Sequence, residues 1–265
     1  MFGPPIAMAA VGAILILQAA NAGPRHEIIL DRIAEREATS WVVPTPSFAD
    51  YQYPRLMLEG AGTEFVLLNK HRPISPLDYT PSDLVEVKSS KYLDNSRQLE
   101  LSASAARALE DMAKDLFDQG QGQLFLNSAY RSYNYQSQLF DSKVKQYGMA
   151  EALLRSAKAG FSEHQTGLAA DVSVPSQGCA IMTCFGDTEA GIWIAENAWR
   201  YGFIVRYKVD TQPITGYSYE PWHLRFVGKE VAKLYTERGM KTLEEFWGLP
   251  AAPDYLPEIT ESTSN

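Results

Sequence analysis

The chain has 265 residues, 45% of them apolar, and a formal net charge of −8 at pH 7. This length accommodates one large domain or two small ones, and the apolar fraction is sufficient for a hydrophobic core. Because the chain is acidic and its Lys and Arg residues form no long run, we expect no nucleic-acid partner, whereas an anionic polymer such as a cell wall is not excluded.

The first 22 residues are predicted to direct export. Residues 2–22 carry no charge, and Ala20-Asn21-Ala22 forms an A-x-A pattern before Gly23, which is typical of a signal-peptidase site. The same segment is long enough to cross a bilayer uncleaved, since ~20 residues suffice. We therefore expect an exported protein of the periplasm or cell envelope, with residues 1–22 either a signal peptide or a membrane anchor. A cytosolic protein with a buried N-terminal helix is the alternative.

The remaining chain divides into three predicted parts. Residues 23–62 are expected to be a linker, because Pro44, Pro46 and Pro54 interrupt regular structure. Residues 63–248 hold the periodic patterns of a folded domain. Residues 249–265 are polar and contain proline, so we predict a disordered tail.

Within the domain, apolar spacing and stop signals predict helices at about 102–119, 135–147, 150–159, 187–201, 229–238 and 242–247. The last helix begins with a capping box formed by Thr242 and Glu245. Strand patterns occur at about 64–68, 123–127, 168–174, 203–207 and 222–227. Apolar and polar residues alternate in these strands, which favours an antiparallel sheet. We predict an α+β domain, a small antiparallel sheet with helices packed on it.

Two stretches of the domain each combine a histidine with an acid. His164 precedes Asp171, and strand alternation places Asp171 on the face away from the apolar side chains. His223 likewise alternates with apolar residues in the last predicted strand. Two His and one Asp, with a fourth position left for water, are typical of a catalytic zinc site. The sequence therefore predicts that His164, Asp171 and His223 bind Zn²⁺.

Peptide hydrolysis at zinc also needs a carboxylate that transfers protons and a cation or donor that meets the oxyanion. Glu220 lies in the same stretch as His223 and is the candidate general base. Arg131 follows a predicted strand, where functional side chains are often displayed. From the residues alone, alternatives remain open: surface histidines, a solvent-facing Asp171 and a structural salt bridge of Arg131. The spacing does not match the helical H-E-x-x-H form.

Several ordered motifs extend over about Glu64 to Gly248. They are Ser128-Ala-Tyr-Arg-Ser-Tyr133 with Gln136, Ser162-Glu-His-Gln-Thr-Gly-Leu-Ala-Ala-Asp171, Asn197 with Tyr201-Gly-Phe203 and Arg206-Tyr207, Thr215-Gly-Tyr217, and Glu220-Pro-Trp-His-Leu-Arg225. In these motifs the chain resembles the VanY-type D-alanyl-D-alanine carboxypeptidase family. Members of this family are zinc peptidases that share a fold with lysostaphin and the amino-terminal domain of Hedgehog proteins.

The resemblance implies the same zinc ligands, with Glu220 as catalytic base and Arg131 stabilising the oxyanion or orienting the scissile carbonyl. It further implies that Ser162 and Gln136 line the substrate site. The chain departs from the family in having Ala159 where a proline is common before Gly160, a change that affects loop stiffness rather than chemistry.

Cys179 and Cys184 lie in an inserted loop that is not expected throughout the family. In an exported protein the two cysteines are predicted to form a small-loop disulfide of modest stabilising effect. Two unpaired thiols in a mobile loop are the alternative, whereas a zinc site is disfavoured because no second Cys or His pair accompanies them. The loop is also placed to shape the substrate cleft.

The resemblance implies a zinc carboxypeptidase that removes the C-terminal D-alanine from peptidoglycan stem peptides. The alternatives are an L,D-carboxypeptidase on tetrapeptide stems, a peptidoglycan endopeptidase, and a zinc-bearing binding module without turnover. Glu220 argues against the binding module, because a non-catalytic protein has no need to keep base, ligands and Arg131 together.

Overall fold

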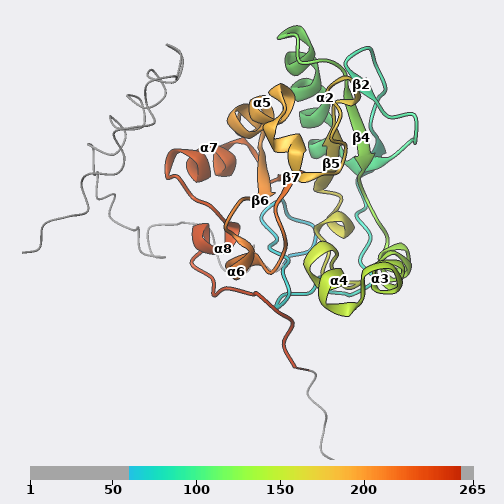
Figure 1. The fold of residues 1–265 in the computed structure, drawn as a ribbon, viewed down its shortest axis with the longest axis vertical. Coiled ribbons are helices and arrows are strands. Elements are labelled where there is room, and N and C mark those ends of the chain that lie inside the picture. Colours follow the sequence, from blue (N-terminus) through green and yellow to red (C-terminus); the bar gives the residue numbers. More distant parts are fainter. Residues whose placement is uncertain (1–59, 258–265) are drawn as a thin grey trace, which may run out of the picture. The chain divides into compact units, whose positions relative to one another are not determined.

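A computed structural model describes residues 60–257. The predicted export segment at 1–22, the linker as far as residue 59 and the tail from residue 258 lie outside the described residues. The described part is a mixed α+β fold, in which helices pack around small sheets (Figure 1). The predicted fold class is therefore confirmed. In this part of the chain no helix is long and apolar enough to cross a membrane.

The main sheet has five strands in the order β2-β4-β5-β7-β6. Their bounds are Leu93–Asp94 (β2), Leu124–Ser128 (β4), Ala169–Ser173 (β5), Phe203–Tyr207 (β6) and Glu220–Phe226 (β7). All neighbouring strands are antiparallel except β2 and β4, which are parallel. A second, two-stranded sheet pairs β1 (Leu84–Glu86) with β3 (Glu100–Ser102). The predicted antiparallel sheet is thus confirmed, with one parallel edge strand added.

The predicted helices are present with small differences at their ends. The α-helices are Ala103–Asp118 (α2), Tyr133–Tyr147 (α3), Met149–Arg155 (α4), Glu189–Asn197 (α5), Gln212–Thr215 (α6), Lys229–Glu237 (α7) and Leu243–Phe246 (α8). Short 3-10 helices are Glu163–Thr166 (η4), Pro175–Gln177 (η5), Thr183–Asp187 (η6) and Ala198–Tyr201 (η7). The capping box of Thr242 and Glu245 at the start of α8 is confirmed.

Helix α2 supplies the largest helical contribution to the core beneath the sheet. Its apolar stripe is fully buried and packs with residues of β4, β5 and β7. A second apolar cluster joins β6 to α7 and α8 through Ile204, Val231, Tyr235 and Phe246. The first cluster holds the central strands β5 and β7 in place, and these strands carry two of the predicted zinc ligands.

The prediction of a strand at residues 64–68 is wrong. Residues 64–68 pair with no strand, although Val66, Leu67 and Leu68 are buried. The carbonyl oxygens of the segment accept side-chain hydrogen bonds instead: Arg225 Nη2 donates to Val66 O at 2.6 Å and to Glu64 O at 3.1 Å. The apolar residues of the segment are buried, as their type predicts. Its backbone carbonyls, however, are paired with the side chain of Arg225 and not with a neighbouring strand.

For residues 249–257 the prediction of a disordered tail is also wrong. Ala252 is buried and its N–H donates to Ile214 O at 2.7 Å. The Tyr255 hydroxyl accepts a hydrogen bond from Lys158 N at 2.8 Å, and its ring meets Phe161 edge-on at 4.9 Å. The polar composition hid these few apolar anchors, so the folded domain extends to residue 257.

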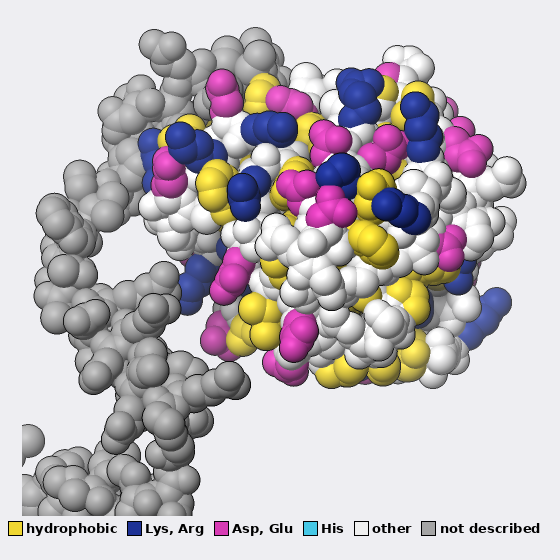
Figure 2. Space-filling view, turned by 90° about the horizontal axis from the view of Figure 1, so that it is seen from above, with side chains coloured by type: hydrophobic (Ala, Val, Ile, Leu, Met, Phe, Trp, Pro, Cys, Tyr) yellow, Lys and Arg dark blue, Asp and Glu magenta, His cyan; other side chains and the backbone are white. Residues whose placement is uncertain are grey.

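Charged side chains of both signs are mixed on the surface. The view from above in Figure 2 shows Lys and Arg interspersed with Asp and Glu over this face of the described part. The described part also has exposed ion pairs one helical turn apart, such as Lys114 with Asp118 at 2.6 Å. Solvent screens such pairs, so they add little to stability.

Candidate metal centre and active site

The sheet register places two of the predicted ligands next to each other. Strands β5 and β7 are antiparallel neighbours, and Asp171 lies directly opposite His223. His164 comes from η4, which precedes β5. Between them Gly167 has φ 70°, a left-handed conformation that glycine adopts without a Cβ penalty, and the chain turns there from η4 toward the sheet. The fold therefore brings together three residues that come from three different elements of the chain.

One ligand atom from each of His164, Asp171 and His223 lies within 4.8 Å of the others. His164 Nε2 is 3.3 Å from Asp171 Oδ2, and His223 Nδ1 is 3.1 Å from Asp171 Oδ1. All three residues are buried. This compact set of two imidazoles and one carboxylate matches the donor types of a catalytic zinc site.

The backbone after β4 fixes the orientation of His164. Its Nδ1 lies 2.7 Å from the carbonyl oxygen of Ala129, so Nδ1 carries the proton and donates. Nε2 is then the unprotonated nitrogen, and it is buried without a hydrogen-bond partner among the described residues. A metal ion bound between the three ligand atoms would satisfy this nitrogen, so the site fits Zn²⁺.

The carboxylate of Glu163 fixes the orientation of His223. Its Nδ1 faces Asp171, while Nε2 lies 3.3 Å from Glu163 Oε2. The other oxygen of Glu163 accepts hydrogen bonds of 2.9 Å from Arg206 and from Arg225. Glu163 therefore holds one nitrogen of His223 and leaves the other for the metal.

This charge network continues away from the metal centre. Arg206 forms a two-pronged pair with Glu244 of α8, with distances of 2.9 and 2.8 Å. The side chains of Glu163, Arg206 and Arg225 are 0% exposed. Glu163, Arg206 and Arg225 stand within the sequence motifs, although no role was predicted for them. An arginine within a predicted buried strand indicates a buried ion pair, because a buried charge requires a partner.

The metal-free electrostatics differ between the two imidazoles. Burial, with the charge of Arg131, lowers the pKa of His164 to about 4. Burial acts in the same direction on His223, but its hydrogen bonds to Asp171 and Glu163 outweigh it and raise the pKa of His223 to about 9. The pKa of Asp171 and that of Glu163 are held well below the usual range: burial opposes this, but the imidazoles and arginines around them prevail.

Glu220 and Arg131, the predicted catalytic residues, lie at the same centre. Glu220 begins β7, and its Oε2 is 3.7 Å from His223 Nδ1. Burial raises the pKa of Glu220 to about 7. Arg131 lies beyond the end of β4; burial lowers its pKa, while the charges of Asp171 and Glu220 oppose that shift. Its Nε is buried and has no hydrogen-bond partner among the described residues, so this donor is available to a substrate.

The centre opens into a cavity of 490 Å³. Ser162 lines it, as predicted from the resemblance. Gln136 is not among the lining residues: it is buried, and its Nε2 donates to Ala157 O at 2.7 Å and to Ser156 Oγ at 3.2 Å. Ser156 and Ala157 do line the cavity, so Gln136 supports its wall from behind.

Aromatic side chains absent from the predicted set also line the cavity. They are Tyr207, Tyr217, Tyr219 and Trp222, together with Tyr147 of α3. Tyrosine and tryptophan combine apolar surface with a polar edge, which suits contact with a peptide. Tyr207, Tyr217 and Trp222 stand within the quoted motifs, but the sequence alone does not separate an aromatic residue that lines a cavity from one that packs in a core.

Comparisons with known proteins relate the chain to carboxypeptidases. The family model for VanY, D-alanyl-D-alanine carboxypeptidase, matches residues 98–229. A D-alanyl-D-alanine carboxypeptidase of Enterococcus faecium is 30% identical over 80% of this chain and 70% of its own length. The chain belongs to the D-alanyl-D-alanine carboxypeptidase family. YodJ of Bacillus subtilis (strain 168), a candidate carboxypeptidase, is 42% identical over 68% of this chain, and the match spans 66% of that relative.

Solved structures of peptidases share the fold. The LdcB LD-carboxypeptidase superposes with a TM-score of 0.63 at 39% identity, covering 71% of this chain and 87% of the other. A variant of the vancomycin-resistance D,D-pentapeptidase VanY, in complex with Zn(II), superposes with a TM-score of 0.57 at 32% identity, covering 68% and 97%. The family resemblance, the enzyme class and the zinc prediction are thereby confirmed.

Proposed function

We propose that this protein is a zinc-dependent carboxypeptidase that removes the C-terminal D-alanine from peptidoglycan stem peptides. The observation that carries the proposal is the convergence of a His-Asp-His ligand set, the Glu220 carboxylate and the Arg131 guanidinium on one cavity. Family membership supports the substrate class, since relatives are D-alanyl-D-alanine carboxypeptidases.

Each residue has a definite task in this chemistry. Bound zinc would polarise the scissile carbonyl and lower the pKa of a coordinated water. Glu220 accepts a proton from the attacking water and delivers it to the leaving amine, a role suited to a carboxylate whose pKa is raised to about 7. Arg131, with Nε unpartnered, donates to the oxygen that becomes negatively charged. Ser162 at the cavity wall orients the peptide.

An L,D-carboxypeptidase acting on tetrapeptide stems is the second candidate. The likeness to the LdcB LD-carboxypeptidase favours it. The two activities use the same metal chemistry and differ in the residue that precedes the scissile bond. They therefore differ in the fit of that residue in the cavity and not in the ligands.

Defined stem peptides separate these candidates. Zinc-loaded protein is incubated with a stem pentapeptide and a stem tetrapeptide, and the products are identified by mass. Release of one D-alanine from the pentapeptide supports the proposal, whereas release only from the tetrapeptide supports the L,D activity. Cleavage inside a cross-linked peptide would establish an endopeptidase, and the Glu220→Ala variant controls for contaminating peptidases.

We further propose that the protein works outside the cytoplasm. The uncharged segment at residues 2–22 and its A-x-A ending support export, and so does a disulfide between Cys179 and Cys184, since disulfides persist in oxidising compartments. Amino-terminal sequencing tests this. A mature chain beginning at Gly23 indicates a cleaved signal, intact Met1 in the membrane fraction indicates an anchor, and intact Met1 in the cytosol overturns the proposal.

A further inference from the structure

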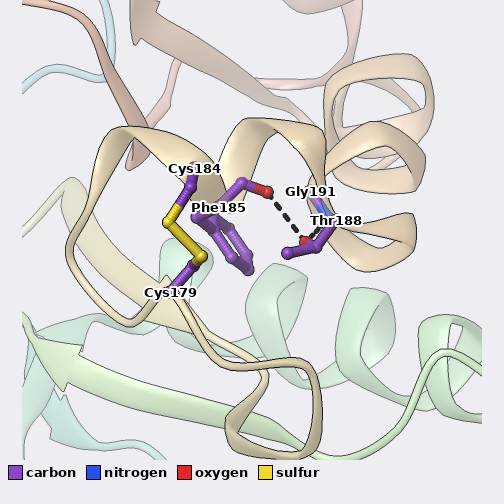
Figure 3. The surroundings of a disulfide bond; sticks show 5 residues. All are labelled: Cys179, Cys184, Phe185, Thr188 and Gly191. Atoms are coloured by element: carbon purple, nitrogen blue, oxygen red, sulfur yellow. Dashed lines mark hydrogen bonds between the residues drawn. A yellow bond between two sulfur atoms is a disulfide. The ribbon is translucent and has the colours of Figure 1, made fainter.

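The loop between β5 and α5 is closed by a disulfide. Cys179 and Cys184 are bonded, with their Cα atoms 5.6 Å apart, which confirms the predicted pairing. Figure 3 shows the loop seated against the start of the helical segment that follows it. The disulfide thus ties together the two ends of a short excursion of the chain.

The loop is anchored on the core immediately after Cys184. Phe185 is fully buried, and its carbonyl oxygen accepts a hydrogen bond of 2.8 Å from Thr188 Oγ1, which in turn accepts one of 3.0 Å from Gly191 N (Figure 3). A Cβ atom at Gly191 would clash with the carbonyl of Phe185. This close approach of α5 to the loop leaves the loop little freedom to move.

Inside the loop, Ile181 has an unfavourable backbone conformation. Its φ is 53°, and that of Cys179 is 58°. The left-handed region is costly for a residue branched at Cβ, and glycine would adopt it without cost. Such conformations persist where the surrounding structure enforces them, often at sites that contact a ligand.

Ile181 borders the active-site cavity. Ile181 and Thr183 line the same cavity as Glu220 and the zinc ligands. Ile181 remains 41% exposed, whereas His164 and His223 are 1% and 4% exposed. Ile181 therefore lies at the rim of the cavity and the metal ligands lie at its floor.

We propose that the disulfide-closed loop is a specificity wall, on which Ile181 contacts the aliphatic side chain of the diamino acid at the third position of the stem. This inference rests on the proposed function. In a carboxypeptidase a single residue lies beyond the scissile bond, so the peptide that reaches the rim is the part upstream. The diamino acid carries the first long aliphatic side chain upstream of the D-alanines, and an exposed isoleucine complements it.

The experiment compares two substrates and pairs of variants. One substrate is a stem pentapeptide with lysine at the third position, and the other has alanine there. The Ile181→Gly variant removes the side chain and relieves the backbone, so its melting temperature should be unchanged or higher. Its kcat/KM should fall about tenfold or more on the lysine peptide and little on the alanine peptide, the scale expected for losing an apolar contact.

Met182→Ala is the matched control. Met182 lies beside Ile181 and is 52% exposed, but it does not line the cavity, so kcat/KM on both peptides should stay unchanged. The double variant Cys179→Ser with Cys184→Ser should lose the same discrimination as Ile181→Gly. Zinc content should remain that of the wild type in all variants.

An equal loss on both peptides, or none, would overturn the inference. Failure of the proposed function has a different signature, because the zinc-loaded wild type would then release no D-alanine from either peptide. A wild type that cleaves both peptides with equal efficiency would also contradict a contact with the third residue.

Discussion

The two imidazoles of the candidate metal centre are oriented by different kinds of group, which we call their supports: a neutral backbone carbonyl for His164 and an ionised carboxylate for His223. His164 donates to a backbone carbonyl, that of Ala129, and its pKa falls to about 4. His223 contacts the carboxylate of Glu163, and its pKa rises to about 9. A neutral support leaves an imidazole ready to coordinate, whereas an ionised support makes it a stronger ligand that must first lose a proton.

The difference extends into the fold. His164 is oriented through Nδ1 by the backbone carbonyl of Ala129, directly after β4, and by no side chain of the described residues. The support of His223 runs through Glu163 and Arg206 to Glu244 on α8, all of them buried. Substitution of side chains can therefore weaken the second support without touching the first, and this makes the comparison testable.

The largest effect is expected from substitution of Glu220, which should reduce turnover without reducing zinc binding. Glu220→Ala removes the proton-transferring carboxylate and keeps every ligand, so turnover should fall by about 10²–10⁴-fold with zinc still near one per chain. His223→Ala should instead lose the zinc, and activity with it. Metal content, substrate affinity and turnover of both variants are measured side by side. If Glu220→Ala loses its zinc or keeps near-normal turnover, Glu220 is not the general base.

The next effect concerns the charged support itself. Glu163→Gln keeps the shape of the side chain but removes its charge, so zinc affinity should fall by about 10–100-fold, as for other residues that orient a metal ligand. Competition with a chelator measures it, and the spectrum of the cobalt-substituted protein reports the altered geometry. Glu244→Gln is the control, because it changes the same network without contacting His223. Equal zinc affinities for both variants would refute the special role of Glu163.

The pKa values predict how zinc binding depends on pH. Below about 9, His223 is protonated in the metal-free protein, and each lower pH unit reduces its coordinating form tenfold, whereas His164 stays neutral down to about 4. Apparent zinc affinity should therefore rise about tenfold per unit from pH 6 to 8, with release of about one proton. Calorimetry in buffers of different ionisation enthalpy measures the protons. Release of no proton would contradict the raised pKa of His223.

The smallest effect tests whether the distant end of the network matters. Thr242→Ala removes the side-chain cap of α8 and should lower the free energy of unfolding by about 1 kcal/mol. Because Glu244 and Arg206 remain paired, zinc affinity should not change. Thermal unfolding and zinc titration are compared with Thr242→Ser, which retains the hydroxyl. A fall in zinc affinity would show that the support of His223 depends on the position of α8.

Patterns that depend on near neighbours predicted the structure well. The apolar stripe of α2, the capping box of α8 and the alternation in β5 and β7 are set by 3.6-residue and two-residue periods, so they can be read locally. The alternation also placed Asp171 and His223 away from the core side chains. Ordered motifs then identified the residues that the structure brings to one cavity.

The sequence alone predicted the family and the candidate ligand and base residues, because residue types and short spacings carry that chemistry. Only the tertiary structure decided which groups support them. Glu163 meets Arg206 and Arg225 across separations of 43 and 62 residues, and no local period encodes such a contact. The same reason explains why Gln136 lies behind the cavity wall and why residues 64–68 are buried without a strand. Side-chain partners and packing across the sheet exist only once the strands are in register.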